Sequence, residues 1–287
     1  MSKAETGRLC VGVDLHKTQF TICALNEDGE YLLEKQYPTK EEGYSEFARE
    51  MHRFEEQGCS IELAVETTGN ARFFKNRMES EFFAVKVVNT NRFKVITMST
   101  KKTDANDAAT LAYYLMKDML PEAHLCSQTS EEIRRLLKTR SVLVQSMVKI
   151  KNQIHGMMLG YGIETKAAQL QSKRKRQELI NDLEDHNFSA YTAPSLKVML
   201  KILDDLSAEI KGIEKLLEEM VASNEDVALL MTVPGIGINT ATVIAAYTAE
   251  LERFEGNYKK FASYVGIIPS VHNSNETTHY GRITKHG

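Results

Sequence analysis

The stretch LCVGVDL (residues 9–15) decides the fold expected for the first third of the chain. It is a short apolar run that ends at an acidic residue, Asp14, which is typical of a strand with a polar group at its end. Two more strand-like runs follow at residues 19–25 and 31–37. The residues between them, Asn26 to Gly29, contain the Asp-Gly pair of a hairpin turn, so the sequence predicts three antiparallel strands.

The pattern then alternates between helix and strand. We expect a polar helix over residues 41–57, a strand over residues 60–66, a helix over residues 71–80, a strand over residues 83–89 and a helix from Asp104. This order predicts an α/β domain with a mixed sheet.

The stretch KKTDANDA (residues 101–108) places two carboxylates at helical spacing. Asp104 and Asp107 are three residues apart, so on a helix their Cβ atoms lie about 5–6 Å from each other and the charges repel. A bound cation would relieve that repulsion. The pattern also fits simple capping, because Thr103 is a good N-cap and acids in a first turn suit the helix dipole.

Four carboxylates can meet in this domain. Asp14 ends the first strand and Glu66 ends the fourth, so they lie close together if those strands are neighbours. A helix over that edge of the sheet brings Asp104 and Asp107. Two Mg²⁺ ions, about 3.5–4 Å apart, would neutralise the four acids and clamp a phosphodiester. Taken singly, Asp14 also fits a turn and Glu66 also fits a surface position.

Basic residues offer candidate contacts to phosphate. Lys101 and Lys102 directly precede the paired carboxylates. The net charge of the whole chain is −3, but residues 130–176 carry eleven lysines and arginines against three glutamates, a local charge of +8. This segment is a candidate polyanion surface, or equally a solvated helix face. Its densest run consists of Lys173, Arg174, Lys175 and Arg176.

The middle of the chain has the spacing of a coiled coil. Apolar residues recur at intervals of three and four along one helix, which is typical of a continuous seam. The seam consists of Leu196, Met199, Leu203, Leu206, Ile210, Ile213, Leu217 and Met220. An earlier helix, from Ile133 to Met157, keeps the same spacing except at Arg140. The two helices form either a hairpin within one chain or an arm that joins chains.

The stretch TVPGIGINTATVIAAY (residues 232–247) predicts two helices joined by a tight turn. Gly235 and Gly237 would let the backbone approach a phosphate, and the free N–H groups of the second helix would point toward it. This helix-hairpin-helix pattern holds nucleic acid without reading bases. A plain glycine turn between packed helices is the alternative.

Composition narrows the cellular setting. No apolar run reaches membrane-spanning length, and the first residues, MSKAETGRLC, do not form a signal peptide. The four cysteines are scattered without a CxxC pair, so they predict neither a zinc site nor a disulfide framework. We expect a protein of the reducing cytoplasm.

Five motifs, in order, resemble a known family. VGVDLHK, AVETTGN, KKTDANDA, TVPGIGINTATVIAAY and FASYVGIIPS follow the order found in the Piv/MooV-type DEDD transposases of the insertion sequence 110 family. The resemblance implies an α/β plus all-α fold with three parts. These are an RNase H-like (RuvC-like) mixed-sheet domain over residues 1–126, a basic helical coiled-coil segment over residues 127–223, and a small helix-hairpin-helix transposase domain over residues 224–287.

The resemblance also implies an activity and a site. Members cut and rejoin DNA with an acidic tetrad, here Asp14, Glu66, Asp104 and Asp107, which binds Mg²⁺, and with a serine nucleophile, here Ser274. The implied partners are the DNA of the element ends and target, a structured guide RNA in some members, and further copies of the chain as a dimer or tetramer. The implied location is the nucleoid of a bacterial or archaeal cell.

The choice of Ser274 also has a local argument. Threonines are stiff at χ1, which disfavours Thr277 and Thr278. Ser270 follows Pro269 directly and has less reach, whereas Ser274 is expected in the middle of a loop. Ser270 stays the alternative.

The sequence departs from the family pattern at two places. Asn275 stands where the family has glycine, and the chain stops at Gly287, where members continue into a helical tail. Two other functions therefore stay open: a metal-only RuvC-like nuclease, and a truncated, inactive protein that only binds nucleic acid.

Overall fold

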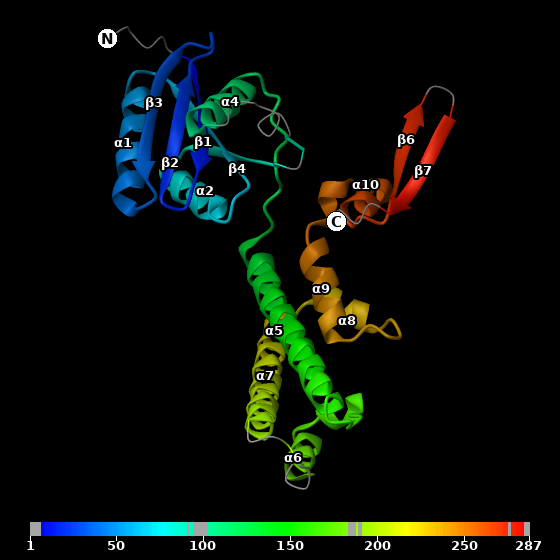
Figure 1. Cartoon of the computed structure of the whole chain (residues 1–287). Coiled ribbons are helices and arrows are strands. Elements are labelled where there is room, and N and C mark those ends of the chain that lie inside the picture. The colour runs from blue at the N-terminus through cyan, green and yellow to red at the C-terminus, as the bar shows by residue number, and fades with distance from the viewer. Residues whose placement is uncertain are drawn as a thin grey trace. The chain divides into compact units, whose positions relative to one another are not determined.

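The computed structural model describes residues 7–90, 92–93, 103–182, 188, 191–274 and 277–283. The chain divides into two compact units, Met1–Leu125 and Cys126–Gly287, called here the N-terminal and C-terminal units. Figure 1 shows the elements of each. Among the described residues, no helix has the length and apolar character needed to cross a membrane.

The N-terminal unit is built on a five-stranded mixed sheet with the order β3-β2-β1-β4-β5. The strands are β1 (Arg8–Leu15), β2 (Gln19–Leu25), β3 (Tyr31–Pro38), β4 (Ser60–Glu66) and β5 (Ala84–Val88). Strands β1, β2 and β3 pair antiparallel, whereas β4 pairs parallel with both β1 and β5. The predicted mixed sheet is confirmed. Its first and fourth strands are neighbours, which was the condition for Asp14 and Glu66 to lie close together.

Helices cover both faces of this sheet (Figure 1). Helices α1 (Glu41–Glu56) and α2 (Ala71–Glu79) share one buried core with alternate residues of β1, among them Val11 and Val13. Helix α4 (Asp104–Met116) packs on the opposite face. The strand alternation therefore assigns odd-numbered residues of β1 to the α1–α2 face and even-numbered residues to the α4 face.

Helix α4 approaches β1 closely at Gly12. A Cβ atom placed there would lie 2.0 Å from the carbonyl oxygen of Ala108 and 2.4 Å from the amide nitrogen of Ala112. Both are backbone atoms of α4, which a change of rotamer cannot move. Glycine is therefore required here because strand and helix backbones are in direct contact.

The C-terminal unit is mostly helical. Its helices are α5 (Gln128–Leu159), α6 (Lys173–Asp182), α7 (Thr192–Val221), α8 (Glu225–Met231), α9 (Ile238–Thr248) and α10 (Tyr258–Tyr264), with short 3₁₀ turns η1 (Ala167–Leu170) and η2 (Leu251–Phe254). A two-stranded antiparallel ribbon ends it, formed by β6 (Pro269–Ser274) and β7 (Thr277–Ile283).

Helices α5 and α7 form an antiparallel pair within one chain. Ile133, at the start of α5, packs with Leu217 near the end of α7, and Ile154 packs with Leu196 at the start of α7. Arg140, the residue that interrupts the predicted seam of α5, forms an ion pair with Glu214 of α7 at 2.7 Å. Most of the seam is thus buried or half-buried within the chain, although Met220 is exposed, and oligomerisation stays a prediction.

Of the two predicted segment boundaries, one lies between the compact units and the other lies inside a unit. The one near residue 126 coincides with the division between the units. The one near residue 224 falls inside a shared core, where Leu217 of α7 packs with Val227 of α8 and Ala241 of α9. The helical segment and the last segment therefore belong to one compact unit.

The sequence-based expectation for the serine segment was wrong in its secondary structure. Ser274 is not in the middle of a loop but is the last residue of β6, where it pairs with Thr277 of β7. The β-branched residues Val271, Thr277 and Thr278 favour strands, which explains the ribbon.

Candidate metal centre at the end of strand β1

Three elements meet at the end of β1 and bring acidic residues to one face of the sheet. Asp14 lies on the α4 face, because even-numbered residues of β1 face that helix. The parallel register pairs Val13 with Val65, which places Glu66 beside Asp14 on the same face. Helix α4 begins at this edge, with Asp104 and Asp107 in its first turn.

The first turn of α4 is also capped as the sequence suggested. The side chain of Thr103 accepts a hydrogen bond from the backbone nitrogen of Asn106 at 3.3 Å. Capping and a cation site are thus compatible, since the cap fixes the helix start from which both carboxylates project.

The ring of His16 lies between two of these carboxylates. Its Nε2 atom is 3.1 Å from Oδ2 of Asp14 and 3.4 Å from Oδ1 of Asp104. One ligand atom from each of the three residues lies within 4.8 Å of the others. Asp14, His16 and Asp104 therefore form a compact group of possible metal ligands.

The electrostatics show that the acids crowd one another. The pKa of Asp14 is raised, chiefly by burial, and the negative charges of Asp104 and Asp107 raise it further, while His16 opposes the shift. Asp14 is 9% exposed and Asp107 is 8% exposed. Buried carboxylates held this close need positive charge nearby to stay ionised.

The four predicted acids therefore differ in how close they lie to the compact group. Asp14 and Asp104 belong to the compact group, and Asp107 is near enough to act on the charge of Asp14. Glu66 is placed by the strand register on the same face. Carboxylate oxygens are the donors that Mg²⁺ prefers, so this donor set fits a hard divalent cation.

Sequence reasoning missed His16. The residue is visible in VGVDLHK, two positions after Asp14, and residues two apart share one side of an extended chain. The spacing of two residues between Asp14 and His16 was therefore the signal that could have placed His16 at the site.

The predicted basic residues differ in their surroundings. Lys101 and Lys102 lie outside the described residues. Lys173 and Arg174 are exposed and Lys175 is partly buried. Arg176 is only 2% exposed, and its Nε donates to Oδ1 of Asp204 at 2.8 Å.

Arg176 also donates from Nη1 to the carbonyl oxygen of Leu170 at 2.9 Å. Its guanidinium is therefore committed inside the C-terminal unit, and the prediction that it contacts nucleic acid is corrected. In the sequence nothing separates it from its three basic neighbours.

The glycine turn between α8 and α9 is exposed. Gly235 has a φ of +92°, which favours glycine, and Gly237 is the N-cap of α9. A Cβ atom at either position would meet nothing within 4 Å, so a ligand backbone has room to approach. The side chain of Ser274 lies outside the described part of the structure.

Carboxylates at adjacent strand ends of a mixed sheet, joined by a helix that carries two more, are consistent with an RNase H-like DEDD domain. Residues 11–163 match the family model of IS110-type DEDD transposases, described as "Transposase", and residues 227–287 match the "Transposase IS116/IS110/IS902 family" model. The chain therefore belongs to the insertion sequence 110 family of transposases, which are enzymes of DNA strand transfer.

Similar proteins agree along nearly the whole chain. The "Transposase for insertion sequence element IS1328" of Yersinia enterocolitica is 24% identical over 281 residues, which cover 96% of this chain and 78% of that protein. The "Transposase for insertion sequence element IS1111A" of Coxiella burnetii is 23% identical, with 96% and 73% covered. A "Probable family 20 transposase" of Pseudomonas aeruginosa is 21% identical, with 96% and 79% covered.

Proposed function

We propose that this transposase cuts and rejoins DNA at the ends of its own element with an acidic metal centre and a serine nucleophile. One observation carries the proposal. At the end of β1, ligand atoms of Asp14, His16 and Asp104 lie within 4.8 Å of one another. The proposed metal ligands are Asp14, Glu66, Asp104 and Asp107.

The acids are the proposed binding site of Mg²⁺, which would polarise the phosphodiester and stabilise negative charge on its oxygens. The raised pKa of Asp14 supports a cation here, because burial and two neighbouring carboxylates disfavour its ionised form. Within the compact group we assign His16 a positioning role and not a ligand role, because its Nε2 lies 3.1 Å from Oδ2 of Asp14 and 3.4 Å from Oδ1 of Asp104.

The proposed nucleophile is Ser274. Its Oγ would lose its proton and form a bond to phosphorus while the bond from phosphorus to the neighbouring sugar oxygen breaks, and the proton given up by the serine balances the one that this oxygen takes up. The phosphoserine link keeps the bond energy, so a second hydroxyl can attack it and release the serine without ATP. The position of Ser274 at the end of β6, beside the connection to β7, supports access to a DNA strand.

The proposed partners are DNA of the element ends and target, and further copies of the chain. A structured guide RNA is a further proposed partner, and the exposed Lys173 and Arg174 on α6 support a polyanion surface there. The proposed location is the cytoplasm of a bacterial or archaeal cell, at the nucleoid.

Trapping of a protein–DNA adduct tests the proposal. The full chain is incubated with Mg²⁺ and end-labelled DNA of its element ends, and covalent adducts are resolved under denaturing conditions. We expect an adduct with the wild type and with Ser270→Ala, and none with Ser274→Ala. An adduct that survives Ser274→Ala would remove Ser274 from the role, and one lost only with Ser270→Ala would move the role there.

A metal-only nuclease is the second candidate. It is favoured by the fact that the compact acidic group is formed within the N-terminal unit alone, so the proposed metal centre needs no residue of the C-terminal unit. Nicked DNA that accumulates with Mg²⁺ and without an adduct would support this candidate. Binding without any cleavage would indicate an inactive nucleic-acid-binding protein.

A further inference from the structure

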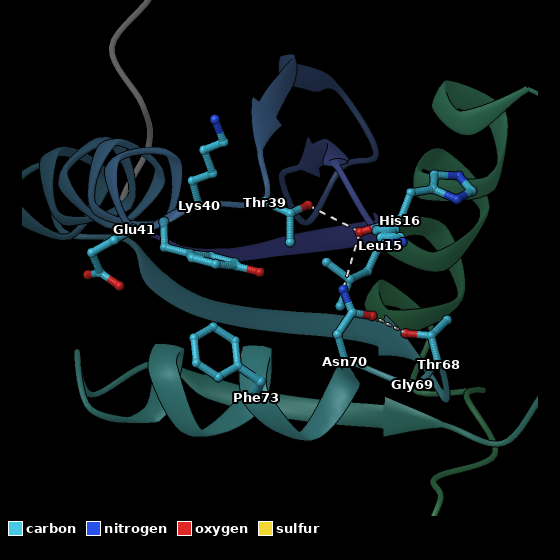
Figure 2. A pocket seen from close by; sticks show the side chains of 11 residues that line it. Leu15, His16, Thr39, Lys40, Glu41, Thr68, Gly69, Asn70 and Phe73 are labelled. Atoms are coloured by element: carbon cyan, nitrogen blue, oxygen red, sulfur yellow. Dashed lines mark hydrogen bonds between the residues drawn. The ribbon is translucent and has the colours of Figure 1, made fainter.

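A pocket of about 700 Å³ opens on the opposite side of the β1 end from the acidic group. Its walls come from the end of β1, the β3–α1 connection, the start of α1, the β4–α2 loop and the first turn of α2 (Figure 2). The volume is in the range of sites that hold small organic groups.

His16 joins the pocket to the candidate metal centre. Its ring contacts Asp14 and Asp104, while its backbone carbonyl accepts hydrogen bonds from Oγ1 of Thr39 at 3.1 Å and from Nδ2 of Asn70 at 3.2 Å (Figure 2). A ligand in the pocket is therefore separated from the carboxylates by a single residue of the chain.

One wall of the pocket is aromatic. Phe73 on α2 is 55% exposed, although it packs against Tyr44 of α1 with ring centroids 5.5 Å apart. Tyr44 is 2% exposed, and its hydroxyl has no hydrogen-bond partner of normal geometry. Burial raises the pKa of this hydroxyl, and the nearby Thr39 side chain lowers it in part. An open ring face beside a buried hydroxyl is suited to a planar, polar ligand.

The rim of the pocket is positively charged. Lys17 and Lys40 line it, are exposed, and form no ion pair with the described part of the chain. The one acidic residue of the lining, Glu41, is engaged by Nη2 of Arg77 at 2.8 Å. An anion at the rim would thus meet two ammonium groups that have no ion pair among the described residues, and one neutralised carboxylate.

We propose that this pocket receives an unpaired nucleobase of the strand whose phosphodiester lies at the acidic group. The base stacks on Phe73, and the phosphate that follows it lies between Lys17 and Lys40. Every base has a π-face, so the site is tolerant of sequence, and the base must leave its pair to enter. The inference rests on the proposed function, because it names the part of the DNA that this site holds.

Binding without metal tests the pocket separately from catalysis. The full chain is titrated in EDTA with an oligothymidylate of about ten nucleotides and with an abasic deoxyribose-phosphate chain of equal length, and fluorescence anisotropy is measured. Wild type should bind the thymidylate more tightly. Phe73→Ala should reduce that preference by roughly 5- to 150-fold, the range for stacking one base.

Controls isolate the stacking contact. Tyr31→Ala removes another exposed ring, 65% exposed at the far end of β3, and should leave the preference unchanged. Phe73→Leu keeps apolar volume without an aromatic face, and should lose the preference while the unfolding temperature stays at the wild-type value. This variant carries the test if Phe73→Ala does not fold. The double variant Lys17→Ala/Lys40→Ala should weaken the binding of the thymidylate and of the abasic chain equally.

An unchanged preference in a folded Phe73 variant would overturn the proposal. So would thymidine 5′-monophosphate bound as tightly as the oligonucleotide, since the pocket would then be a nucleotide site and not a strand site. A chain that shows the Phe73-dependent preference but never cleaves DNA would leave the pocket standing and remove the proposed function instead.

Discussion

Helices α4 and α7 each pack along a neighbour, but by different means. Helix α4 lies on β1 with its backbone in direct contact at Gly12, where a single added carbon would meet Ala108 and Ala112. Helix α7 lies on α5 through apolar side chains such as Leu203, with the Arg140–Glu214 ion pair across the seam. The first contact leaves no room for one added carbon, whereas the second is a layer of side chains that can repack.

The difference matches what each helix carries. The start of α4 holds Asp104 and Asp107 near enough to raise the pKa of Asp14, so a displacement of α4 would change the charge interactions of the acidic group. Helix α7 carries no predicted catalytic residue. Substitutions should therefore have large and specific effects at the α4 contact, and smaller, graded effects along α7.

The largest expected effect is on activity at the start of α4. Asp104→Asn should lower DNA cleavage at least about 100-fold, because metal-held charge stabilisation supplies several kcal/mol. The unfolding temperature in EDTA should stay the same or rise slightly, since one source of repulsion on Asp14 is gone. Asp107→Asn should behave alike, and Asp28→Asn in the β2–β3 turn is the matched control. Wild-type turnover by either α4 variant would end the metal interpretation.

Gly12→Ala tests the backbone contact directly. The added carbon must displace α4, so we expect about 3 kcal/mol of lost stability, at the upper end for overpacking. Denaturant unfolding, followed by a probe in the N-terminal unit, measures the change. Unaltered stability would mean that helix and strand do not touch as described.

Arg176→Ala should cost less, about 2 kcal/mol, because it leaves Asp204 without its partner inside the C-terminal unit, although Asp204 keeps some contact with water. Arg174→Ala is the control, since that side chain is exposed and should change stability by less than about 0.5 kcal/mol.

The same two variants separate stability from DNA binding. Arg174→Ala should flatten the log–log salt dependence of binding by about 0.9 for each phosphate that this side chain neutralises, whereas Arg176→Ala should leave the slope alone. If the folded Arg176→Ala variant gave a flatter salt dependence of DNA binding, the predicted contact of Arg176 with nucleic acid would be restored.

The smallest expected effect is a gain. Gly212 lies inside α7, and a Cβ atom there would meet nothing within 4 Å. Gly212→Ala should therefore stabilise the C-terminal unit by roughly 0.5–1 kcal/mol, through better helix propensity. The same chemical change that disrupts α4 thus strengthens α7, and a loss of stability at Gly212 would show that something covers this face.

The strands and the mixed character of the sheet could be predicted because their signals are local. Apolar runs such as LCVGVDL, the Asp-Gly turn after Asn26 and the alternation of later strands and helices determine a mixed sheet with few alternatives. The ends of β1 and β4 could be predicted as well, but the proximity of Asp14 and Glu66 depended on the pairing of these two strands, which only the structure supplies.

The rest depends on contacts between distant residues, which local patterns do not encode. Arg176 is distinguished from Arg174 only by Asp204, which is 28 residues away along the chain. The role of His16 depends on Asp104 of a later helix. The pocket beside Phe73 exists only once three connections meet around the end of β1.

The end of β1 also has a consequence for how variants of this protein combine. Asp14 and Leu15 leave the strand on opposite faces, so the acidic group and the pocket share one short piece of backbone, with His16 held from the pocket side by Asn70. A change at Asn70 shifts the imidazole that contacts Asp14, and a change at Asp14 shifts the carbonyl that Asn70 binds. We therefore expect epistasis here. The free-energy effect of a paired substitution at Asp14 and Asn70 should differ from the sum of the two separate effects.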